Sequence, residues 1–210
     1  MRIGIVACEI LKKEIEAIIA DDPEVVHREY LEWGLHDCPD MLRSKVIERA
    51  NALEGKVDVV FLGYAICNSL ASLPDEIRVP FVMLREEDCI ASMLGALEYA
   101  KERAECPGTW FSSPGWAELG IDAIVRDDQM LGLEEQGYTK LHFAKLQLDG
   151  YSRCLAIDTG VGDFEHYYAL TRELAEMLEL KCESRQADLA TIKSAWRKIK
   201  EGRWERFSNR

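Results

Sequence analysis

Short apolar segments alternate along the chain with longer segments of mixed polarity. The clearest apolar runs are RIGIVA at residues 2–7, VDVVFL at 57–62 and VPFVML at 79–84. Such runs are typical of strands that are buried on both faces of a parallel sheet. The pattern predicts further strands at 24–30, 109–112, 152–157 and 180–183.

Between these strands, apolar residues recur at helical spacing. Helices are predicted at 9–20, at 38–54 with Asp37 as the N-cap, at 89–104 with Asp88 as the N-cap, after Asp163, and at 187–200. In the helix over 89–104, the spacing points Met93, Leu94, Leu97 and Ala100 inward.

Alternation of strands and helices predicts an α/β fold. We expect one doubly wound, mostly parallel sheet of the flavodoxin or Rossmann-like kind, with helices on both faces. If its strand order is 2-1-3-4-5, the first, third and fourth strands are neighbours. The sequence shows no linker, so we expect a single domain over residues 1–210, with a helical insertion near 116–150.

Composition narrows the possible partners. Acidic residues outnumber basic ones by 38 to 26, a net charge of −12, which is unsuited to general binding of nucleic acid or anionic membranes. No apolar run approaches the roughly 20 residues of a membrane span. The start, MRIGIVACEI, leads quickly into charged residues and is too short for a signal peptide, so a cytoplasmic location is expected.

The 7 cysteines are many for such a chain, and their odd number argues against a disulfide framework. Three of them, Cys8, Cys67 and Cys89, each follow one of the clearest apolar runs. The carboxyl ends of neighbouring parallel strands form the edge where ligands bind in such sheets. The tips of three neighbours span roughly 10 Å, so these cysteines could converge on one metal ion or cluster.

His36 and Cys38, in the loop after the second strand, are candidates for a fourth ligand. Zinc takes four ligands of this kind in a structural site, or three and an open position in a catalytic one. Iron–sulfur clusters take mainly thiolates. Metal-free thiol chemistry and plain burial stay open as alternatives, because cysteine is also among the most buried residue types.

Other candidate ligand or pocket residues lie elsewhere. Asp158 begins a glycine-containing turn, DTGVGD, from strand to helix, which is either an anion cradle or a plain capped turn. Trp110 lines a pocket or packs in the core. Cys106, Cys154 and Cys182 are interpreted as structural.

These motifs also carry a family resemblance. IVACEIL at 5–11, GLHD at 34–37, LGYAICN at 62–68, DCI at 88–90 and PGTW at 107–110 resemble the motifs of domain-of-unknown-function family 1638, over most of the chain from residue 2 to about 180. The resemblance implies Cys8, Cys67, Cys89 and His36 as a shared metal site, with Tyr64 and Asn68 in the turn beside it. Ala65 and Asn68 stand where the family pattern often has glycine.

The resemblance further implies an association with corrinoid-dependent methyl transfer. We therefore expect a metal-binding protein, holding zinc or an iron–sulfur cluster, that acts in one-carbon metabolism. Its partner would be a small-molecule substrate or a corrinoid or methyltransferase protein. A non-catalytic accessory protein of such a system and a metal-free cysteine enzyme are the alternatives.

Overall fold

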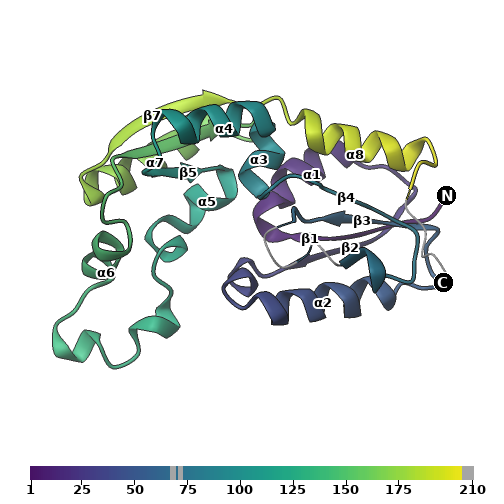
Figure 1. The fold of residues 1–210 in the computed structure, drawn as a ribbon, viewed down its shortest axis with the longest axis horizontal. Helices are drawn as coiled ribbons and strands as arrows, with labels where there is room; N and C mark the ends of the chain where they lie inside the picture. The colour runs from purple at the N-terminus through teal and green to yellow at the C-terminus, as the bar shows by residue number, and fades with distance from the viewer. Residues whose placement is uncertain (67–69, 71–72, 205–210) are drawn as a thin grey trace. The chain divides into compact units, whose positions relative to one another are not determined.

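The computed structural model spans residues 1–210 and describes all of them except 67–69, 71–72 and 205–210 (Figure 1). The chain forms two compact units, Met1–Ala96 with Leu189–Arg210, and Leu97–Asp188. Each has a parallel sheet covered by helices, which confirms the α/β class. The strands lie in two sheets, where the sequence led us to expect one. The single domain stays a prediction, because a division into compact units does not show whether each folds alone.

The sheet of the first unit has the order β2-β1-β3-β4, and every pairing in it is parallel. Its strands are β1 (Ile3–Cys8), β2 (Val25–Leu31), β3 (Val59–Gly63) and β4 (Phe81–Met83). The first, third and fourth strands are therefore neighbours, as the candidate site at the sheet edge assumes. The fifth predicted strand belongs to the other sheet.

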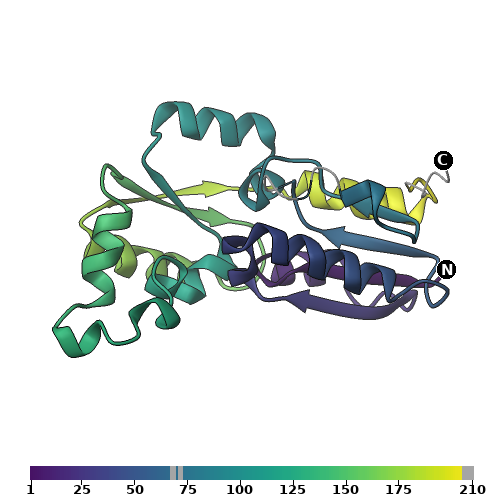
Figure 2. The same ribbon diagram turned by 60° about the horizontal axis from the view of Figure 1, so that its bottom comes forward.

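Helices cover both faces of this sheet: α1 (Lys12–Ile19), α2 (Pro39–Asn51), α3 (Cys89–Leu94) and α8 (Ala190–Lys200). Figures 1 and 2 show α2 on one face and α8 on the other. Val6 and Val60 belong to the core cluster shared with α2. From the opposite face, Phe61 meets Trp196 of α8, with ring centroids 6.3 Å apart. Alternating residues of the strands therefore serve two separate apolar layers.

Gly63, the last residue of β3, has no room for a side chain. It is the register partner of Ala7 on β1, and a Cβ on it would lie 2.4 Å from the Ala7 Cβ and 2.7 Å from Ile15 Cδ1. The glycine thus lets β3 and α1 approach each other just before the segment that leads to Cys67.

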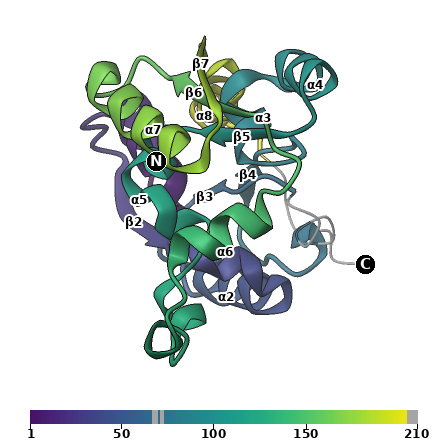
Figure 3. The same ribbon diagram turned by 90° about the vertical axis from the view of Figure 1, so that its left-hand side faces the viewer.

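The second unit has the sheet order β5-β6-β7, again parallel. Its strands are β5 (Thr109–Ser112), β6 (Arg153–Asp158) and β7 (Lys181–Gln186), and its helices are α4 (Ala96–Glu105), α5 (Pro114–Leu119), α6 (Lys140–Gln147) and α7 (Phe164–Leu178). Short 3-10 turns at Gly120–Ala123, Asp127–Met130 and Glu134–Gln136 link α5 to α6. In Figure 3 the sheet lies between α4 and α7.

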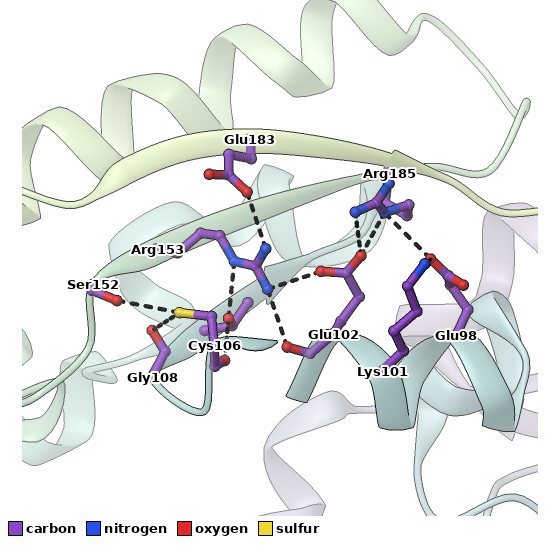
Figure 4. Close-up of polar contacts among 10 residues, drawn as sticks. Glu98, Lys101, Glu102, Cys106, Gly108, Ser152, Arg153, Glu183 and Arg185 are labelled. Carbon is purple, nitrogen blue, oxygen red and sulfur yellow. Dashed lines mark hydrogen bonds and ion pairs between the residues drawn. The ribbon is translucent and has the colours of Figure 1, made fainter. Parts of the chain in front are cut away.

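Buried charges occupy the α4 face of this sheet (Figure 4). The Arg153 guanidinium lies 2.9 Å from Glu102 Oε2 and 3.0 Å from Glu183 Oε2. Arg185 on β7 also pairs with Glu102, and more weakly with Glu98. The Glu102 side chain is 0% exposed and that of Arg153 is 5% exposed. Because both side chains are buried away from water, the positive charge of Arg153 and the negative charge of Glu102 must compensate each other.

One predicted helix is broken. The segment expected as a single helix over 89–104 forms α3 and α4, separated at Gly95. The positive φ of Gly95, 85°, ends α3 in a conformation that L side chains rarely adopt. The break changes the helical phase, so the prediction that Leu97 and Ala100 point inward is wrong: Leu97 is 90% exposed, and Ala100 is exposed as well. Among the described residues, no helix is long and apolar enough to cross a membrane.

Glu102→Gln is expected to lower the free energy of unfolding by about 3 kcal/mol, because it leaves the buried Arg153 guanidinium without its full countercharge. Glu98→Gln is the matched control on the same helix. Its carboxylate is 34% exposed and also pairs with Arg185, so the expected loss is below about 1 kcal/mol. Urea denaturation followed by circular dichroism measures both. Equal losses in the two variants would contradict this account of the buried pair.

Gly63→Ala is expected to destabilise the protein by about 1–3 kcal/mol, because the new methyl group meets the rigid β1 backbone and Ala7. Gly4→Ala is the control: its Cβ would approach Leu53 Cδ1, the movable end of a side chain, at 2.7 Å. We expect a clearly smaller fall in melting temperature for Gly4→Ala. The opposite order of the two melting temperatures would disprove the packing argument.

Candidate functional site

The carboxyl ends of the four parallel strands of the first unit lie at one edge of its sheet. Cys8 is the last residue of β1, and Cys89 is the first residue of α3, shortly after β4. Both are partly buried, and Cys8 packs against the core cluster on the α2 face. With β3 between β1 and β4, the strand tips are about 10 Å apart. The strand order thus places these two cysteines at the predicted edge.

Two hydrogen bonds hold the loops of this edge together. The Ile66 N–H donates to the Glu86 carbonyl at 3.0 Å, which joins the segment after β3 to the segment after β4. The Trp33 N–H donates to Glu9 Oε1 at 2.6 Å, which joins the residue after Cys8 to the loop after β2. The chain is therefore fixed immediately before Cys67 and immediately after Cys8.

Asp88 fixes Cys89 at the start of α3. Its Oδ1 accepts a hydrogen bond from the Ala91 N–H at 2.8 Å, and its carbonyl accepts one from Ser92 Oγ at 2.9 Å. This confirms Asp88 as the N-cap. The cap determines where the backbone of Cys89 begins the helix.

The candidates for a fourth ligand lie in the loop after β2. His36 and Cys38 are both exposed. His36 Nε2 lies 3.6 Å from Asp37 Oδ1, and its ring stands edge-on to Trp33 with centroids 6.2 Å apart. The prediction that Asp37 caps α2 is wrong. The N-cap is Cys38, without a side-chain hydrogen bond, because Asp37 still belongs to the 3-10 turn Trp33–Asp37.

Cys67 and Asn68 lie outside the described residues. In the part of the chain that the structure describes, no three His, Cys, Asp or Glu side chains form a group that could hold a metal ion. Cys8, Cys89 and His36 are not such a group among the described residues, to which Cys67 does not belong. The predicted set stays a prediction.

Two further buried side chains lie in the elements that follow β1 and β3. Tyr64, which follows β3, is 4% exposed. Glu14, in the first turn of α1, is 0% exposed, and the sequence analysis did not single it out. A signal for it exists: Glu14 lies four residues after Ile10 and four before Ile18, within the apolar stripe of that helix. A buried carboxylate is a candidate acid or base.

The remaining candidates belong to the second unit. Asp158 Oδ1 accepts the Gly160 N–H at 2.9 Å, and Asp163 caps α7 through the His166 N–H. Trp110 packs against Trp116, with ring centroids 6.1 Å apart. Its indole Nε1 is buried and has no hydrogen-bond partner within the described residues.

Cys106 lies beside the charged network of the second unit (Figure 4). Its Sγ is 3.2 Å from Ser152 Oγ and 3.8 Å from the Gly108 carbonyl. The hydrogen bond with Ser152, followed by that with Thr109, lowers the pKa of the Cys106 thiol against the opposing effect of burial. Nearby positive charge on Arg153 acts in the same direction as the hydrogen bonds.

Comparison with known proteins identifies the family of the chain. The family described as "Protein of unknown function (DUF1638)" matches residues 30–196. No curated protein matches the chain. Among solved structures, one titled "Crystal Structure of Arylmalonate Decarboxylase" aligns with 95% of this chain and 92% of its own, at 13% identity and a TM-score of 0.37. A likeness this weak carries no argument about chemistry.

Ser152→Ala is expected to raise the pKa of the Cys106 thiol and so to slow its alkylation at neutral pH. The hydroxyl stabilises the thiolate, and only the thiolate reacts. Alkylation by iodoacetamide across a pH series, read by mass spectrometry on the peptide that contains Cys106, measures the shift. Ser184→Ala, on the exposed β7, is the control and should leave the profile unchanged. An unchanged profile in Ser152→Ala would rule out this hydrogen bond as the cause.

Proposed function

The chain belongs to the DUF1638 family, and from this membership together with the sheet edge of the first unit we propose a cysteine-based metal site there. Cys8, Cys67 and Cys89 would be the ligands, with His36 as the fourth ligand or as an acid–base group. The observation that supports the proposal is the strand order β2-β1-β3-β4, because the carboxyl ends of these strands, with Cys8 at the end of β1, share the edge where such sheets bind ligands.

Three described features support a site of this kind. The Asp88 cap fixes Cys89, the bond from Trp33 to Glu9 fixes the His36 loop next to Cys8, and the bond from Ile66 to Glu86 holds the chain on the N-terminal side of Cys67. Preorganised ligands lose less conformational entropy on binding a metal than ligands on loose loops.

The proposed ligands fit either of two metal groups, a zinc ion or an iron–sulfur cluster. Three thiolates and an imidazole suit zinc, which would lower the pKa of a substrate thiol, and thiolates also suit an iron–sulfur cluster, which would transfer electrons. The chain itself supplies the buried Glu14 carboxylate on α1, the helix after Cys8, which would hold or accept a proton. Our placement of the protein in one-carbon or corrinoid-linked methyl transfer, with a small molecule or a corrinoid or methyltransferase protein as partner, rests on the family resemblance.

A second candidate function is a metal-free cysteine enzyme. The observation that favours it is the lack of a three-ligand group among residues 1–66, 70 and 73–204, which leaves Cys8 and Cys89 as two cysteines at the ends of parallel strands with a buried carboxylate in the next helix. This candidate predicts a thiol that alkylates rapidly in metal-free protein. A third, an accessory protein, predicts that a methyltransferase partner binds Cys67→Ala as well as it binds the wild type.

Anaerobic purification followed by metal analysis and visible absorption tests the metal site. We expect stoichiometric zinc or iron in the wild type, its loss in Cys67→Ala and Cys8→Ala, and its retention in Cys106→Ala, whose cysteine lies in the other unit. A brown protein would identify a cluster, and a colourless one with zinc would identify a zinc site. No metal in the wild type, or metal that survives both substitutions, would overturn the proposal.

A further inference from the structure

Two cysteines of the second unit stand directly opposite each other in its sheet. Cys154 on β6 is the register partner of Cys182 on β7. Neighbouring strands lie about 4.8 Å apart, within the roughly 4.4–6.8 Å between Cα atoms that a disulfide spans. Register partners in a parallel pair also point to the same face of the sheet. Sequence spacing did not reveal this pair, since 27 residues separate the two positions along the chain.

The thiols lie on the face opposite the buried charges. Arg153 and Glu183, their chain neighbours, pair with each other on the α4 side. The alternation of side chains therefore turns Cys154 and Cys182 toward α7, which packs on β6 and β7. Tyr168 of α7 forms a hydrogen bond with Cys182. Burial, and after it the charge of Cys182, raises the pKa of Cys154 to about 12, as expected for two neighbouring thiols under a helix.

The two thiols differ in access to solvent. Cys154 is 0% exposed and lies on the central strand of the β5-β6-β7 sheet. Cys182 is partly exposed and lies on β7, a strand with no buried residue. Cys182 is thus the more accessible of the two thiols, although burial raises its pKa as well, and Cys154 lies beside it away from solvent.

We propose that Cys154 and Cys182 are a redox-active dithiol that a small-molecule disulfide converts into a cross-strand disulfide. The Cys182 thiolate attacks one sulfur of the reagent RSSR, whose S–S bond breaks and releases RS⁻. Cys154 then attacks the Cys182 sulfur of the mixed disulfide and passes its proton to the departing sulfur, which leaves as the second RSH. Two protein thiols and RSSR give one protein disulfide and two RSH.

The geometry makes this disulfide reversible. In a parallel pair the Cβ atoms of register partners lie about as far apart as the strands, slightly beyond the roughly 3.5–4.5 Å of a relaxed disulfide. β7 must therefore move toward β6 when the bond forms, and its exposed or half-buried residues permit this. A strained disulfide is reduced more easily than a relaxed one, so mild thiols are expected to restore the dithiol.

The test is disulfide mapping of the full-length protein after incubation with oxidised glutathione. Trypsin cuts after Arg153, Arg172, Lys181 and Arg185, so the disulfide would join peptide 154–172 to peptide 182–185. We expect this linked pair, the loss of both thiols to alkylation after unfolding, and their return with dithiothreitol. Recovery of both peptides alkylated, or linkage of either cysteine to a different one, would overturn the proposal.

Variants distinguish Cys182, the thiol that attacks the reagent, from Cys154, the thiol that resolves the mixed disulfide. In Cys154→Ala, Cys182 is expected to remain a mixed disulfide with glutathione, because no second thiol resolves it. In Cys182→Ser, Cys154 is expected to stay a thiol, because no reagent reaches it. Cys106→Ser, in the same unit, is the matched control and should form the linked pair as the wild type does. Cys182→Ser substitutes a partly exposed position, so it provides a folded variant even if the buried substitution prevents folding.

Discussion

The alternation of side chains along parallel strands is the constraint on which both units depend. In the first unit it sends Val6 and Val60 to the α2 face and Phe61 to the α8 face. In the second it sends Arg153 toward α4 and Cys154 toward α7. A shift of β6 by one residue would exchange a buried charge with a thiol. The Glu102–Arg153 ion pair therefore specifies the register that also sets the two thiols side by side.

The sequence predicted the strands of the first unit well, because buried parallel strands have continuous apolar runs that end in recognisable turns. It also predicted Asp88 and Asp163 as helix caps, and the structure confirms both. Caps depend on a few neighbouring residues, so local sequence suffices to find them. The placement of Cys8 and Cys89 at one edge follows from these local features and the strand order.

Other features of the fold could not be predicted, because the pattern of polar and apolar residues does not determine them. Gly95 fits inside a helical pattern, and only its positive φ shows that the helix ends there and exposes Leu97. The division of the strands between two sheets depends on tertiary contacts, and the hydrophobic periodicity of the sequence does not show it. The opposition of Cys154 and Cys182 needs the register of β6 and β7, and β7 has almost no apolar pattern from which to infer it. Buried Glu14 was overlooked because charged residues are expected at the surface.

The first unit is discontinuous along the chain, since residues 97–188 of the second unit come between its strands and α8. Trp196 of α8 meets Phe61 on β3, so α8 covers apolar side chains on one face of the first sheet. A ribosome delivers all of the second unit before it delivers that helix. During synthesis the second unit can therefore form all of its internal contacts first, while the part of the first sheet that α8 covers is still exposed to water.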